Sequence, residues 1–175
     1  CRSEVPSESF GRLMACAMYT GIWWKMLHGE RAVSAVLTRA RAHVSWGRQE
    51  LVEKAIEAGA DWLLWLDDDA CPPIDLAPRL YAHQKDMVAP LFYKRGFPFE
   101  HTCTRILGDT LLSNEGAPFA RPKQELELVD PFPRRLFRCD TVGFHAVLMQ
   151  RHVVLGVREM FGTDPLFQIG PAIGE

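Results

Sequence analysis

The sequence lacks several patterns that would by themselves define a class of protein. Its five cysteines are scattered along the chain and none lies in a CxxC pair, which argues against a zinc ribbon or a disulfide scaffold. The longest uncharged run, residues 13–24, has 12 residues, whereas a membrane-spanning helix needs about 20. This run also lacks the Lys/Arg-led start and the small-residue cleavage site of a signal peptide. We therefore predict a cytoplasmic protein with reduced thiols and no transmembrane segment.

The chain also carries little net charge. At pH 7 its formal net charge is −2, so its overall electrostatics do not favour nucleic acid or an anionic membrane as a partner. The apolar fraction of 47% and the charged fraction of 24% are typical of a globular protein. Because 175 residues suit one hydrophobic core, we predict a single domain over residues 1–175.

Apolar periodicity divides the first half of the chain into alternating strands and helices. Val5, Pro6 and Ser7 are expected to end a first strand. The helix that follows is expected to turn an apolar stripe towards a sheet, formed by Phe10, Leu13, Met14, Ala17 and Met18. Ser45 is expected to cap the next helix and Gly59 to end it. The other predicted elements are strands at 32–38, 62–66 and 86–93 and a helix at 76–83.

Residues 62–66 form the most informative of these strands. All five are apolar without alternation, a pattern that favours burial on both faces at the centre of a parallel sheet. We therefore predict an α/β fold with a mostly parallel central sheet and helices on both faces. The second half is richer in proline, glycine and charge. There we expect loops and a small antiparallel hairpin region at 94–135, a strand at 137–150 and a helix at 153–161.

Three consecutive carboxylates, Asp67, Asp68 and Asp69, follow the apolar strand. Adjacent like charges repel one another unless a cation neutralises them. In an extended chain Asp67 and Asp69 point to one face and Asp68 to the other. Carboxylate oxygens at the end of such a strand suit Mg²⁺ or Mn²⁺, which in turn binds nucleotide phosphates. The alternative is a solvated acidic turn in which Asp69 caps a helix.

Arg48 and His145 are two further candidates. Arg48 lies near the start of a predicted helix, where helix donors favour anions, and its guanidinium can bind a diphosphate with two hydrogen bonds. Its alternative role is that of a solvated surface arginine. His145 is a candidate metal ligand, or a residue that orients a sugar hydroxyl. Its alternative is a partly buried histidine whose hydrogen bonds are satisfied locally.

The stretch from Ser45 to Asp69 (SWGRQELVEKAIEAGADWLLWLDDD) resembles family-2-type glycosyltransferases of the GT-A fold. In that family a helix opening with Arg-Asn leads to a hydrophobic strand that ends in Asp-x-Asp. Arg48 matches the arginine, Gln49 stands in place of the asparagine, and Asp67 and Asp69 match Asp-x-Asp. Softer similarities continue through residues 75–80, 85–95 and 140–151, and residues 174–175 are similar to the start of a Gly-Glu-Asp segment.

The resemblance implies a GT-A-like, Rossmann-like domain. Residues 1–93 would form a nucleotide-binding half and residues 94–175 an acceptor-side half, truncated at the C-terminus. Glu175 would be the catalytic base, and Asp67 and Asp69 would bind the metal, to which we add His145. The nucleotide-sugar site would consist of Pro6, Ser7, Arg48, Asp67 and Asp68.

The sequence therefore predicts a glycosyltransferase that uses Mn²⁺ or Mg²⁺ to transfer a sugar from a nucleotide diphosphate sugar to an acceptor. Two alternatives remain open at this stage. One is a nucleotide-sugar-binding module without catalysis, and the other is a nucleotidyltransferase on a similar fold.

Overall fold

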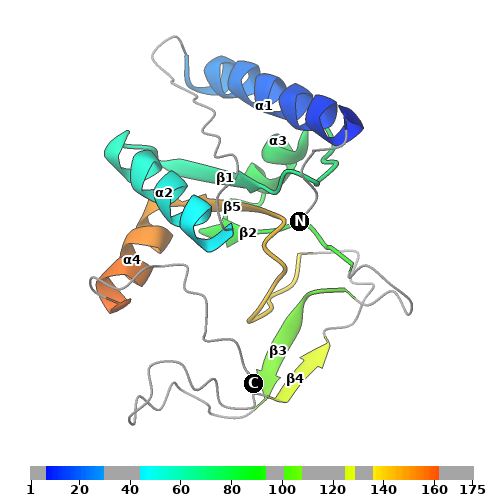
Figure 1. The fold of residues 1–175 in the computed structure, drawn as a ribbon, viewed down its shortest axis with the longest axis vertical. Coiled ribbons are helices and arrows are strands. Elements are labelled where there is room, and N and C mark those ends of the chain that lie inside the picture. The colour runs from blue at the N-terminus through cyan, green and yellow to red at the C-terminus, as the bar shows by residue number, and fades with distance from the viewer. Residues whose placement is uncertain (1–6, 30–43, 94–100, 108–124, 129–135, 162–175) are drawn as a thin grey trace. The chain divides into compact units, whose positions relative to one another are not determined.

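A computed structural model describes residues 7–29, 44–93, 101–107, 125–128 and 136–161 (Figure 1). The described residues divide into two compact units. The first contains the described residues up to Pro90 and those from Phe144 onward, and the second contains those from Leu91 to Gly143. The predicted strand at 32–38, Val5 and Pro6 of the first predicted strand, and residues 162–175 lie outside the described residues.

The first unit contains four helices and three strands among its described residues. The helices are α1 (Ser7–His28), α2 (Val44–Glu57), α3 (Leu76–Tyr81) and α4 (Arg151–Phe161), and the strands are β1 (Trp62–Leu66), β2 (Met87–Val88) and β5 (Ala146–Gln150). The strands form a sheet in the order β1-β5-β2, and β5 runs antiparallel to both neighbours. The prediction of a mostly parallel, GT-A-like central sheet is therefore wrong for the described residues.

The parallel sheet was wrongly predicted because the apolar run at residues 62–66 indicates burial and not strand direction. In β1 only Leu63 is buried, whereas Ala146, Val147, Leu148 and Met149 of β5, the middle strand of this sheet, are all buried. A continuous apolar run indicates contacts on both faces of a strand, but it carries no information on strand direction. The direction follows from pairing between β1 and β5, which are distant in sequence, in a register that includes Leu64 opposite Leu148.

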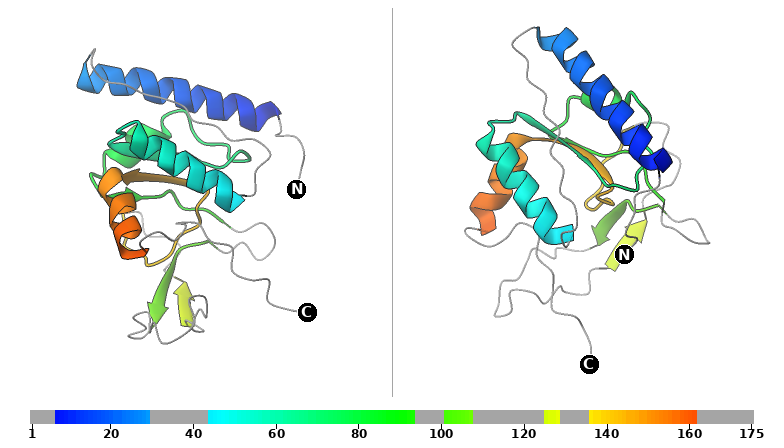
Figure 2. Two further views of the ribbon diagram at one scale, coloured as in Figure 1. Left: turned by 60° about the vertical axis from the view of Figure 1, so that its left-hand side comes forward. Right: turned by 45° about the horizontal axis from the view of Figure 1, so that its top comes forward.

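The core of this unit lies between one face of the sheet and the helices α2 and α4. Because side chains alternate along a strand, Leu63 of β1 and Val147 and Met149 of β5 share this face. They pack with Val52 and Ala55 of α2 and with Val154 of α4. In the right-hand view of Figure 2, α2 and α4 lie on one side of the sheet and α1 lies on the other.

Aromatic side chains join α1, α3 and β1 on the opposite face. The ring of Tyr81 in α3 contacts Trp23 and Trp24 of α1 and Trp62 of β1, with centroids 5.1–5.5 Å apart. The predicted apolar stripe of α1 is wrong, because Phe10, Met14 and Met18 are exposed and the buried residues of this helix include Ser9 and Cys16. No helix within the described residues combines the length and the apolarity that crossing a membrane requires.

The C-terminus of helix α2 was predicted correctly from the sequence, and its N-terminus was not. Its C-terminus is as predicted: Gly59 adopts φ +71°, its N–H bonds to the Ile56 carbonyl, and the Ala60 N–H bonds to the Ala55 carbonyl. At the other end, Val44 already belongs to the helix, so Ser45 lies inside it rather than capping it. For α3, Asp75 occupies the capping position without a side-chain cap bond, because its carboxylate accepts from Arg79 instead.

The second unit contains β3 (Thr104–Leu107) and β4 (Glu125–Leu128), an antiparallel pair within the segment for which we predict a hairpin. Beside it, the Gly143 N–H donates to Thr102 Oγ1 over 3.0 Å, and a Cβ on residue 143 would lie only 2.8 Å from that oxygen. This close approach accounts for the glycine that interrupts the strand predicted at 137–150. The segments around residues 102 and 143 therefore run against each other.

The thiols of the chain are expected to differ strongly in reactivity. Burial, with a smaller contribution from the neighbouring Cys139, raises the pKa of Cys103 to about 11 from the ordinary 9.0. Burial likewise raises the pKa of Cys16. Thiolate is the reactive form, and a shift of this size makes it roughly a hundredfold scarcer at Cys103 near pH 8. Cys71, by contrast, is exposed.

Iodoacetamide at pH 8 is therefore expected to label Cys71 long before Cys16 or Cys103, as peptide mass spectrometry would measure. The same shift links folding to pH. The pKa of Cys103 is raised in the folded chain. The stability that its protonated thiol contributes to the fold is therefore fully present below the unfolded pKa of 9.0, and it is lost as pH rises through about 11. Equal labelling rates for Cys71 and Cys103 in the folded protein would contradict this assignment.

Candidate functional site

The site begins where the pairing of β1 and β5 ends. The last registered pair is Leu66 with Ala146, and the ladder continues by one bond, from the Asp67 N–H to the His145 carbonyl over 2.8 Å. Asp67 and His145 are therefore cross-strand neighbours, whose side chains meet on one face. His145 Nδ1 lies 3.0 Å from Asp67 Oδ2. By alternation, this face is the one that Leu63 and Val147 turn towards α2.

A turn then returns the chain towards this pair. The Ala70 N–H donates to the Asp67 carbonyl over 3.1 Å, which closes a β-turn through Asp68 and Asp69. The proximity of Asp67 and Asp69 was predicted from alternation along an extended strand. The structure brings them together by this turn instead, because the strand ends at Leu66. Asp68 is exposed at the tip of the turn.

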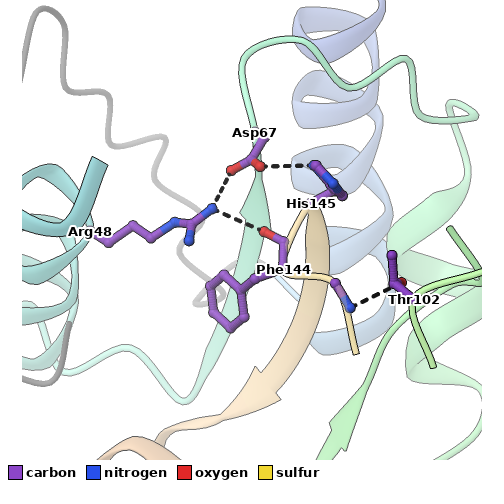
Figure 3. Close-up of polar contacts among 6 residues, drawn as sticks. Arg48, Asp67, Thr102, Phe144 and His145 are labelled. Carbon is purple, nitrogen blue, oxygen red and sulfur yellow. Dashed lines mark hydrogen bonds and ion pairs between the residues drawn. The ribbon is translucent and has the colours of Figure 1, made fainter. Parts of the chain in front are cut away.

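Arg48 reaches the same point from α2 (Figure 3). One of its terminal nitrogens, Nη2, donates to Asp67 Oδ1 over 2.8 Å and to the Phe144 carbonyl over 3.3 Å. The side chains of Arg48 and Asp67 are only 22% and 29% exposed, so this ion pair is better shielded from water than a surface pair. Both oxygens of Asp67 are thus engaged, one by Arg48 and the other by His145.

Phe144 supports Arg48 in two ways. In addition to its carbonyl, its ring lies under the guanidinium, with the Cζ atom 4.9 Å from the ring centroid. The Trp65 ring packs against Phe144 with centroids 5.5 Å apart, which fixes the aromatic surface. The sequence analysis missed Phe144, because an aromatic residue beside a strand is ordinarily a packing residue. Its position next to His145 was the only available signal.

Asp67, Asp69 and His145 form the candidate cation site. One ligand atom from each lies within 4.8 Å of the other two. Donors that share one small divalent ion at about 2.1–2.2 Å lie at most about 4.4 Å apart, so small side-chain rotations suffice to close the site. Two carboxylates and an imidazole suit Mn²⁺ and other transition ions, and the carboxylates also suit Mg²⁺. The residues present therefore fit a divalent cation.

The other residues that the sequence predicted for the site do not all lie in it. Ser7 is the first residue of α1 rather than the end of a strand. Pro6 and Glu175 lie outside the described residues, so their predicted roles stay predictions. Gln49 stands where the family that the sequence resembles has asparagine. Its side chain donates to Glu53, one turn further along α2, over 2.7 Å. The structure thus brings together Arg48, Asp67, Asp69 and His145 from the predicted set.

Comparisons of the chain with protein-family models, curated proteins and solved structures gave no match.

Proposed function

We propose that this chain binds a divalent cation through Asp67, Asp69 and His145 and uses it, together with Arg48, to hold the diphosphate of a nucleotide diphosphate sugar for glycosyl transfer. One observation carries the proposal. Three metal-ligating side chains converge within 4.8 Å, and a guanidinium lies 2.8 Å from the central carboxylate. A bound metal ion and an arginine can each neutralise the charge of a diphosphate.

The chain's own residues would divide the work. Asp67 is held in place by Arg48 and His145, so its carboxylate already lies where a cation would bind. Asp69 supplies a second carboxylate from the turn, and His145 supplies the nitrogen that favours Mn²⁺ over Mg²⁺. A bound cation would supply Lewis-acid stabilisation of the diphosphate leaving group. Arg48 would share that charge, and Glu175 is our candidate to take the acceptor's hydroxyl proton.

Thermal unfolding with UDP and GDP, with and without Mn²⁺, tests the binding part of this proposal. A nucleotide at a hundred times its dissociation constant stabilises the folded state by about 2.7 kcal/mol. For a chain of this size that raises Tm by about 5–10 °C. The increase is expected only when Mn²⁺ is present, and it should be absent in Asp69→Ala.

Asp61→Ala is the matched control, since Asp61 is an exposed aspartate at the opposite end of β1. It should respond to Mn²⁺ and nucleotide as the unmodified chain does. Release of free sugar from UDP- or GDP-sugars, or transfer to an added acceptor, then tests the catalytic part. Binding without turnover would favour the non-catalytic binding module, and stabilisation by neither nucleotide would overturn the proposal.

A further inference from the structure

We propose that Arg48 is an exchangeable counter-cation: it neutralises Asp67 while the metal is absent and transfers to the diphosphate when the metal binds. This inference rests on the proposed function and concerns the regulation of the same site. It predicts that metal and diphosphate binding are coupled through one side chain.

The geometry of Asp67 gives the first step. Its Oδ1 accepts from Arg48 over 2.8 Å and its Oδ2 lies 3.0 Å from His145 Nδ1. A cation bound to Oδ1 would lie beside the Arg48 guanidinium. Two neighbouring positive charges repel strongly in a site that is partly shielded from water. Metal entry therefore favours departure of Arg48 Nη2 from that oxygen.

Phe144 gives the second step, because it holds Arg48 without using a charge. The same Nη2 atom donates to the Phe144 carbonyl, and the ring lies 4.9 Å from the guanidinium carbon. These contacts do not depend on Asp67, so Arg48 stays beside the site after the ion pair opens. A guanidinium retained there, next to a bound cation, is a binding group for the planar oxygen edge of a phosphate.

The exchange predicts effects of opposite sign in one variant. Arg48→Gln removes the competing positive charge, so its affinity for Mn²⁺ alone is expected to rise about fivefold. Its affinity for inorganic pyrophosphate in the presence of saturating Mn²⁺ is expected to fall about tenfold or more. Mn²⁺ binding is measured by the loss of the free-ion electron paramagnetic resonance signal, and pyrophosphate binding by calorimetry. Pyrophosphate is chosen because it tests the diphosphate subsite whatever the base or sugar.

Arg79→Gln is the matched control, since Arg79 also forms a 2.8 Å pair with an aspartate, Asp75, but within α3 and its cap. It should change neither affinity. Arg48→Lys retains a positive charge, so it should not show the gain in Mn²⁺ affinity. If Arg48→Gln weakens Mn²⁺ binding, Arg48 supports the metal ligands instead of competing with the metal, and the exchange is wrong.

Phe144 provides a second test that leaves Arg48 in place. Phe144→Leu removes the aromatic face but keeps the backbone carbonyl, and should weaken pyrophosphate binding about threefold while Mn²⁺ affinity stays within about twofold. Phe144→Tyr keeps the ring face and should restore the unmodified affinity. Unchanged pyrophosphate binding in Phe144→Leu would remove its positioning role. If the unmodified chain binds neither Mn²⁺ nor pyrophosphate, the proposed function itself fails, which is a separate outcome.

Discussion

Replacement of Asp67 by asparagine is expected to lower the affinity for Mn²⁺ by at least about a hundredfold, because even partners of metal ligands contribute up to that factor. The charges explain the size of the effect. Asp67, Asp69 and Arg48 together carry a net charge of −1, and the substitution brings this charge to zero. Asparagine keeps the size of the residue and one acceptor oxygen, which can still accept from Arg48, so the fold should survive.

The measurement for this variant is Mn²⁺ titration followed by paramagnetic resonance, with circular dichroism as the check of folding. Asp61→Asn makes the same chemical change at the other end of β1 and should leave the Mn²⁺ affinity as it is. Undiminished Mn²⁺ binding by a folded Asp67→Asn chain would show that the ion binds away from Asp67.

Val147→Asp is expected to prevent the first unit from folding. Val147 is completely buried in the middle strand, between Leu63 of β1 and the helices α2 and α4. A carboxylate there would lose its hydration without gaining a partner, at a cost of several kcal/mol. That cost is comparable with the total stability of a typical domain, about 5–15 kcal/mol.

Val157→Asp on α4 is the corresponding control, because Val157 is 39% exposed. It should change the free energy of unfolding by only about 0.5 kcal/mol, as surface substitutions usually do. Urea unfolding followed by circular dichroism compares the two. Similar urea midpoints for both variants would mean that β5 is not the centre of the core.

Local signals in the sequence were sufficient for some of the separate elements, whereas the strands predicted at 86–93 and 137–150 cover only residues 87–88 and 146–150 in the structure. The apolar run predicted β1 at residues 62–66, and the glycine with the residues before it predicted the end of α2. The helix at 153–161 was predicted two residues short, because Arg151 and His152 carry no apolar periodicity. These features depend on contacts within a few residues, which a single sequence records well.

The direction of the strands could not be predicted from the sequence, for a physical reason. Parallel and antiparallel neighbours can bury equally apolar strands, so the composition of β1 and β5 does not distinguish them. The exposed positions on α1 show a similar limit: periodicity identified an apolar stripe, but Tyr81 and the tryptophans decide which side of this helix packs.

The candidate site was predicted in its parts but not in its connections. Asp67, Asp69, Arg48 and His145 were each named from residue type and position. Their mutual contacts depend on the register of β1 against β5, which places His145 opposite Asp67. The role of Phe144 depends on the same register, and no local pattern records it.

The junction of β5 and α4 constrains how the length of this chain can vary. Gln150 ends the strand and Arg151 starts the helix, and their N–H groups are held by the carbonyls of Asp86 and Asp61. With that end anchored, inserting or deleting one residue in β5 would reverse the side to which His145 points. Natural or engineered length changes should therefore be tolerated elsewhere before they are tolerated between His145 and Gln150.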